Sequence, residues 1–152
     1  MTSVAVVNQK GGVGKTTVTL GLAEAAAALG LRVLVVDLDP QANASTGLAV
    51  WGADRTIDDV LSEARAGAAL GAVTSSNWPD EGLRPDLIPG SHLLAAREPQ
   101  MISDPLGAQD RLKLALSGAR YDLTLIDCPP SLGLLCVNGL FAADKALIVT
   151  EP

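Results

Sequence analysis

The chain has 152 residues, a formal net charge of −6, a pI of about 4.6 and 48% hydrophobic residues. This length suffices for one domain, residues 1–152, with a hydrophobic core of its own. Its apolar runs are interrupted by Gly, Asp or Arg well short of the ~20 residues that cross a membrane. An acidic chain also lacks the basic surface with which a domain grips nucleic acid by charge alone. A membrane-spanning protein and a domain that binds nucleic acid through its own net charge are therefore both disfavoured.

The N-terminus and the cysteines indicate the compartment. Residues 1–7 lead directly into an apolar segment, with no basic start and no cleavage site, so we expect no secretory signal. Cys128 and Cys136 fit neither a zinc pair nor a redox motif, and we expect both to be buried and reduced. These features predict a cytoplasmic protein.

Short segments rich in Val, Ile and Leu alternate with helix-like segments along the chain. Such runs are typical of strands that are buried on both faces of a parallel sheet. The expected strands are residues 3–8, 32–38, 87–89, 123–127 and 146–150, and the expected helices are residues 15–29, 56–66 and 110–119. Gly30 marks the end of the first helix, and Thr56 begins a capping-box pattern. Residues 67–84 are expected to be a surface connection.

This alternation predicts an α/β fold, doubly wound, with a mainly parallel sheet and helices on both faces. The last expected strand runs close to residue 152, whereas folds of this type normally continue beyond such a strand. We therefore expect the fold to extend past the sequence given.

A glycine-rich segment, residues 10–17, lies between the first expected strand and the first expected helix. The usual phosphate-loop pattern, Gly-x-x-x-x-Gly-Lys-[Ser/Thr], requires glycine at position 9, where this chain has Gln9. The glycines at positions 11, 12 and 14 still allow backbone N–H groups to turn toward a phosphate, and the helix that follows directs its positive end there. The segment therefore predicts a nucleotide site.

The motif assigns a part to each residue of this loop. Lys15 is predicted to reach the β- and γ-phosphates, and the Thr16 hydroxyl to bind Mg²⁺. The residues predicted to contact the nucleotide are Gly11, Gly12, Val13, Gly14, Lys15, Thr16 and Thr17. The implied ligand is a magnesium nucleoside triphosphate.

Carboxylates follow two of the expected strands. Asp37 and Asp39 stand at the end of one strand and Asp127 at the end of another, which in an open parallel sheet is the ligand-binding edge. Neighbouring carboxylates repel each other unless a cation or water uses them. We expect Asp127 to hold Mg²⁺, directly or through water, and Asp37 to lie near the same ion. The alternative that Asp37 or Asp39 merely caps the loop before Pro40 stays open.

Lys10 stands directly before Gly-Gly-Val-Gly-Lys-Thr, and this arrangement resembles the deviant Walker A motif of the ParA/Soj and MinD ATPases. In that family the signature lysine reaches across a dimer to the partner's phosphates, which implies a catalytic role for Lys10, beside the role of Lys15 at the phosphates of its own chain. Residues 39–43 (Asp-Pro-Gln-Ala-Asn) and 127–131 (Asp-Cys-Pro-Pro-Ser) are more similar to the ParA/Soj branch than to MinD. The resemblance implies that Asp39 activates the attacking water.

The resemblance extends over residues 3–151 and implies a function. A ParA/Soj-like protein binds Mg-ATP, hydrolyses it slowly, forms an ATP-dependent homodimer and binds DNA without sequence preference. A ParB-like activator stimulates hydrolysis, and the cycle partitions chromosomes or plasmids on the nucleoid. Residues 128–133 resemble the switch II segment that responds to the γ-phosphate. Such proteins normally continue for several more elements, so we expect a C-terminal part beyond this sequence.

Three alternatives stay open. The first is a MinD-like positioning ATPase that acts on a membrane or protein cargo, which needs a terminal amphipathic helix. The second is a truncated nucleotide-binding or protein-interaction module that keeps the phosphate loop but does not hydrolyse ATP. The third is a ligase or reductase-associated P-loop relative that uses ATP to activate a small substrate, and the segment at 39–43 argues against it by analogy only.

Overall fold

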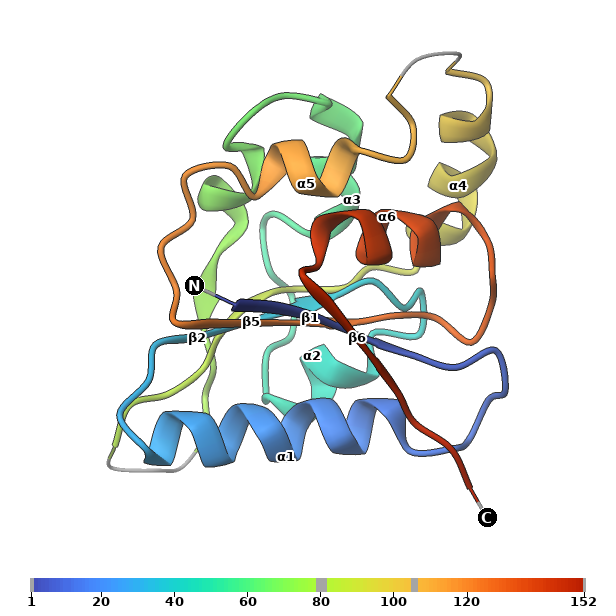
Figure 1. Cartoon of the computed structure of the whole chain (residues 1–152). Coiled ribbons are helices and arrows are strands. Elements are labelled where there is room, and N and C mark those ends of the chain that lie inside the picture. The colour runs from blue at the N-terminus through green and yellow to red at the C-terminus, as the bar shows by residue number, and fades with distance from the viewer. Residues whose placement is uncertain (1, 79–81, 105–106, 152) are drawn as a thin grey trace.

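A computed structural model describes residues 2–78, 82–104 and 107–151 and contains one sheet with the strand order β3-β4-β2-β5-β1-β6 (Figure 1). The strands are β1 (Thr2–Val7), β2 (Val33–Asp37), β3 (Thr74–Ser75), β4 (Asp86–Ile88), β5 (Leu123–Asp127) and β6 (Lys145–Ile148). All neighbouring strands run parallel, except that β3 is antiparallel to β4 at one edge. The predicted mainly parallel α/β fold is confirmed.

Helices cover both faces of this sheet. They are α1 (Lys15–Ala28), α2 (Asn43–Gly47), α3 (Ile57–Glu63), α4 (Leu94–Ile102), α5 (Arg111–Ala115), α6 (Leu134–Ala142) and the 3₁₀ helix η1 (Ala68–Ala72). Figure 1 shows α1 and α2 below the sheet and α3 to α6 above it. In the described part of the chain, no helix combines the length and apolar character needed to cross a membrane.

Alternate residues of the central strands face two separate cores. On β5, Leu125 packs into the core between the sheet and α1, whereas Ile126 packs into the core between the sheet and α3 to α6. On β2, Val35 and Val36 divide in the same way, and all five residues of this strand are buried. This two-sided burial explains why the central strands are apolar throughout rather than alternating with polar residues.

The parallel register brings strand ends from distant parts of the sequence to one edge. Val6 of β1 and Asp37 of β2 both pair with Asp127 of β5, so three loops leave the sheet side by side. These loops are residues 8–14, 38–42 and 128–133. The sequence-predicted loop and carboxylates therefore share one edge.

Most of the predicted elements are present within one or two residues of their expected bounds. The capping box forms as expected, because the Thr56 N–H and the Asp59 carboxylate are bonded at 2.8 Å and the reciprocal side-chain contact is also made. Gly30 adopts φ +81°, as a helix-ending glycine does. Both cysteines are buried and form no disulfide.

The prediction for residues 67–84 is wrong in its first part. Instead of a surface connection, η1 and β3 form there, and the alanines of η1 are buried in the core above the sheet. Their small side chains let η1 approach α3 closely. The Pro79, Asp80 and Glu81 part of the expected connection lies outside the described residues. Helices α2, α4 and α6 were not predicted, since their patterns are short or interrupted by Pro99.

The packing of α6 on the sheet allows a matched test of two glycines. A methyl group added to Gly139 would lie 2.6 Å from Cys128 Sγ and 3.3 Å from Leu38 Cδ1, whereas one added to Gly21 on α1 would meet nothing within 4 Å. We expect Gly139→Ala to lower the free energy of unfolding by about 1–3 kcal/mol through overpacking. Gly21→Ala should raise it by about 0.5–1 kcal/mol through helix propensity. Urea denaturation measures both, and equal effects would contradict this packing.

Candidate functional site

The glycine loop connects β1 to α1. Gly12 and Gly14 adopt φ +79° and +89°, which L side chains rarely adopt, so the chain curves tightly before α1 begins at Lys15. Gly14 is the residue that precedes the helix, and the first turn of α1 contains no acidic side chain. The unpaired N–H groups and the positive end of the helix dipole thus point at the loop without a competing carboxylate from that turn.

The Lys15 amine is held inside the loop. The side chain is buried, and Nζ donates to the backbone oxygen of Lys10 at 3.3 Å. A buried ammonium with a carbonyl partner retains unused donors and little contact with water. An anion placed in the loop would therefore meet a largely desolvated positive charge.

A carboxylate of β5 closes the opposite side of the loop. Asp127 accepts hydrogen bonds from Thr16 Oγ1 at 2.7 Å and from Thr19 Oγ1 at 3.1 Å. Burial raises the pKa of Asp127 to about 6, although both hydroxyls oppose the shift. The predicted residues Thr16 and Asp127 are therefore in direct contact.

Thr19 was missed by the sequence analysis. It stands one helical turn after Thr16 on the same face of α1, so its hydroxyl reaches the other oxygen of Asp127. It also donates to the backbone oxygen of Lys15 at 3.0 Å. The helical spacing of the two threonines was a usable signal.

Asp37 lies beside Asp127 in the sheet register but is bonded to other groups. Oδ2 accepts from the backbone N–H of Ser45 at 2.8 Å and from its hydroxyl at 2.7 Å, and Oδ1 accepts from the N–H of Asp39 at 3.2 Å. Complete burial raises the pKa of Asp37 to about 7, and the nearby Asp127 charge adds to the shift. Its expected place near magnesium stays a prediction, and these contacts do not support it.

Asp39 lies in the tight turn that follows β2. Its Oδ1 accepts from the Gln41 N–H at 2.9 Å, and its backbone oxygen accepts from the Ala42 N–H at 2.9 Å. Ala42 adopts φ +52°, a left-handed conformation that an alanine takes only under constraint. The charge of Asp39 adds to the raised pKa of Asp127, after the larger effect of burial.

Lys10 projects from the loop into solvent. Its amine forms an ion pair with Glu151 at 2.9 Å, and the two side chains are 71% and 50% exposed. An exposed pair of this kind is worth about 1 kcal/mol or less. Lys10 is therefore free to exchange this partner for another anion.

The segment 128–133 lies against the glycine loop. A methyl group on Gly11 would touch Pro130 at 3.9 Å, and the segment turns through a hydrogen bond from the Ser131 N–H to the Pro129 oxygen. Where α6 begins, Glu98 of α4 accepts from the Leu135 N–H at 3.0 Å. This carboxylate satisfies an otherwise unpaired N–H of the first helical turn.

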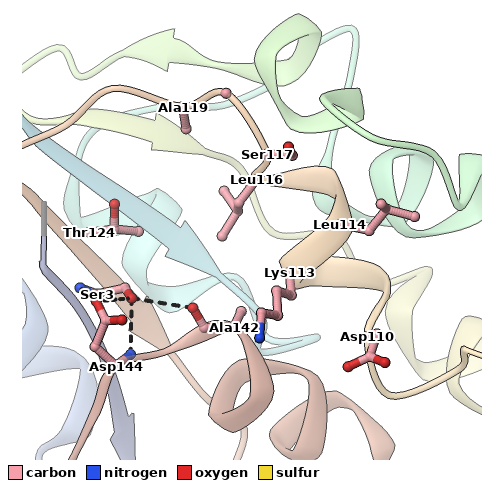
Figure 2. A pocket seen from close by; sticks show the side chains of 11 residues that line it. Ser3, Asp110, Lys113, Leu114, Leu116, Ser117, Ala119, Thr124, Ala142 and Asp144 are labelled. Carbon is pink, nitrogen blue, oxygen red and sulfur yellow. Dashed lines mark hydrogen bonds between the residues drawn. The ribbon is translucent and has the colours of Figure 1, made fainter.

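A separate cavity of about 650 Å³ opens near the amino ends of the strands, between α5 and the start of β6 (Figure 2). There, Ser3 Oγ donates to Asp144 Oδ2 at 2.8 Å. The hydroxyl of Thr124 is buried without a hydrogen-bond partner, and Lys113 lies at the rim. The cavity includes neither the glycine loop nor the carboxylates at the strand ends, so it is distinct from the site above.

The residues at the carboxyl edge fit a magnesium nucleotide. Thr16 and Asp127 supply oxygen donors, which Mg²⁺ prefers, and the positive-φ glycines carry no side chain into the turn of the loop. Among the described residues, no group of three or more His, Cys, Asp or Glu is placed to bind a metal unaided. Fold and loop together define a P-loop nucleotide-binding protein.

Known proteins agree with this class. The family described as AAA domain matches residues 1–152. The sporulation initiation inhibitor protein Soj of Bacillus subtilis is 41% identical over 153 residues, which cover 97% of this chain and 57% of that protein. The chromosome partitioning protein ParA of Caulobacter vibrioides (strain NA1000 / CB15N) is 42% identical over 152 residues, which cover 95% and 54%. The chain belongs to the ParA/Soj family of AAA-domain ATPases.

A solved structure gives the same fold with a nucleotide. Cobyrinic acid a,c-diamide synthase from Mycobacterium smegmatis, with a bound ATP analogue and magnesium, has a TM-score of 0.88 and 35% identity. The match covers 99% of this chain and 60% of that one. The chain thus spans roughly half to three fifths of the length of these relatives.

The buried carboxylates make stability depend on pH. The folded pKa values of Asp37 and Asp127, about 7 and about 6, exceed the value near 4 of an unfolded aspartate. Their contribution is therefore complete below pH 4 and is lost as pH rises through 6 and 7. We expect the free energy of unfolding of the nucleotide-free chain to fall by roughly 2–4 kcal/mol from pH 5 to pH 8, since one unit is about 1.4 kcal/mol.

Urea denaturation at a series of pH values measures this dependence. Asp127→Asn removes one of the two titrating groups, so its free energy of unfolding should fall about half as steeply as that of the unsubstituted chain between pH 4 and pH 6, and equally steeply between pH 6 and pH 7. A stability that rises between pH 5 and pH 8 in the unsubstituted chain would contradict the assignment.

Proposed function

We propose that this chain is the nucleotide-binding part of a partition ATPase that binds and slowly hydrolyses Mg-ATP. The observation that carries the proposal is the direct contact between Thr16 of the phosphate loop and Asp127 at the end of β5. A hydroxyl and an acidic strand end beside a phosphate loop are the parts that hold magnesium in P-loop NTPases. Sequence identities near 40% with Soj and ParA support partition as the process served.

The residues divide the chemistry between them. The loop from Gly11 to Thr17 directs N–H groups at the phosphates, and the Lys15 ammonium compensates their charge. Thr16 and Asp127 would hold magnesium, which would supply positive charge beside the phosphate oxygens when bound. Asp39 orients the attacking water and accepts its proton, for which its place at the strand edge near Asp127 suits it.

Lys10 acts across a dimer of two such chains. Its exposed amine, held by one weak ion pair, exchanges Glu151 for the phosphates of the partner's nucleotide. Positive charge supplied in trans stabilises the transition state as an arginine finger does. The nucleotide state is thereby coupled to dimerisation, because the contact between Lys10 and the partner's nucleotide stabilises the dimer only when the γ-phosphate is present.

The remaining parts of the proposal come from the family. The ATP-bound dimer binds DNA without sequence preference, and a ParB-like protein activates hydrolysis, in the cytoplasm on the nucleoid. The chain's acidic balance, with a net charge of −6, means that such DNA binding uses local basic groups or residues outside this sequence.

The division between binding and hydrolysis is testable with two variants. Lys15→Ala removes the buried ammonium and should weaken binding of a fluorescent ATP analogue by at least about 100-fold, since a charged partner of phosphate is worth roughly 3 kcal/mol. Asp39→Ala should leave that affinity within about threefold and reduce phosphate release by at least about 100-fold. Equal loss of binding in both variants would contradict the assigned roles.

The role of Lys10 has a matched control in its own ion pair. Lys10→Ala should spare nucleotide binding by the monomer but remove ATP-dependent dimerisation, measured by light scattering. Glu151→Ala breaks the same contact from the other side and keeps the lysine, so its dimer should persist. A Lys10→Ala chain that still dimerises with ATP would refute the role in trans.

A second candidate function is ATP-dependent activation of a small substrate. It is favoured by the 35% identity between this chain and the cobyrinic acid a,c-diamide synthase of Mycobacterium smegmatis. A MinD-like role on a membrane cargo is the other alternative. Co-sedimentation with DNA or with liposomes in the presence of ATP separates these candidates, because an amide synthase needs neither.

A further inference from the structure

Asp37 has no unused oxygen in the structure. Both carboxylate oxygens accept hydrogen bonds from the chain itself, from Ser45 and from the N–H of Asp39, at 2.7 to 3.2 Å. The side chain is fully buried. A carboxylate that is shielded and bonded in this way is occupied in holding the turn after β2, which contains Asp39.

Ser45 continues this contact to a second strand. Its hydroxyl donates to Asp37 at 2.7 Å and accepts from the Gly90 N–H at 2.8 Å. Gly90 follows β4, the neighbour of β2 in the sheet. One hydroxyl therefore bonds the loop after β4 to the carboxylate at the end of β2.

Gly90 is the residue that permits this approach. A methyl group at this position would lie 2.8 Å from Asp37 Cγ and 2.9 and 3.1 Å from its two oxygens. Real side chains do not approach so closely, so any residue larger than glycine displaces either the carboxylate or the loop. Gly90 does not adopt a positive φ, and its small size is what the site requires.

We propose that Asp37 is a positioning residue rather than a magnesium ligand, and that Asp37, Ser45 and Gly90 together fix the turn from which Asp39 acts. The proposal rests on the hydrolytic role proposed for Asp39. Its physical reason is that the Asp39 turn contains a strained alanine at φ +52°, and a strained turn persists only where surrounding contacts determine it.

Two measurements on the full chain separate positioning from metal binding. The first is amide hydrogen exchange in the absence of nucleotide, which does not depend on activity. In Ser45→Ala, the Gly90 N–H loses its acceptor and should exchange at least about tenfold faster, with a smaller increase at Asp39. Ser62→Ala is the matched control, because the exposed Ser62 hydroxyl donates to the Asp59 oxygen within α3 rather than to the turn after β2. Unchanged exchange at Gly90 in Ser45→Ala would overturn the proposal.

The second measurement is steady-state ATP hydrolysis as a function of Mg²⁺ and ATP. Ser45→Ala and Gly90→Ala should each lower kcat about tenfold, while KM for ATP and the half-saturating Mg²⁺ concentration stay within about twofold. Asp37→Asn should behave in the same way. If Asp37 binds magnesium, Asp37→Asn instead raises the half-saturating Mg²⁺ concentration at least about tenfold, and the proposal fails.

The two readouts also distinguish this proposal from the proposed function. A wild-type chain that hydrolyses no ATP would remove the role of Asp39, yet the exchange experiment would still show whether Ser45 holds Gly90. Should Asp37→Asn fail to fold, Gly90→Ala tests the same contact from the backbone side. Faster exchange at Ser45 and Asp39 in Gly90→Ala supports positioning, and unchanged exchange refutes it.

Discussion

The hydrogen bond between Thr16 and Asp127 is the contact on which the rest of the site depends. It joins the first turn of α1 to the end of β5, two segments separated by 111 positions in the sequence. The contact forms because β5 lies between β1 and β2, so its carboxyl end emerges next to the glycine loop. A hydroxyl and a carboxylate at this distance provide oxygens for a cation and leave the loop amides for phosphate.

Burying carboxylates at this edge has an electrostatic consequence. Asp37 and Asp127 are register partners on adjacent strands, and both have pKa values raised by loss of hydration. The chain stabilises each in a different way. Asp127 has two threonine hydroxyls that can turn toward other partners, whereas Asp37 has a serine and two backbone N–H groups in fixed positions. Asp127 is thus suited to a cation, and Asp37 to holding a turn.

The loops at this edge are connected to the helical layer above the sheet as well as to each other. Segment 128–133 touches the glycine loop near Gly11 and leads into α6, whose first turn is capped by Glu98 of α4. These contacts connect the glycine loop to α6 and, through Glu98, to α4.

The sequence by itself determined the mainly parallel α/β class, the glycine loop and the acidic strand ends, because hydrophobic runs, Gly-Lys-Thr and strand-end aspartates are local patterns. It gave no sign that alanines 68, 69 and 72 are buried, since small residues fit both a connection and a close contact. Only the tertiary structure placed Thr19 on Asp127, and Ser45 between Asp37 and Gly90. Those contacts join residues on different strands and helices, and which hydroxyl meets which carboxylate is decided by register and helix packing rather than by spacing along the chain.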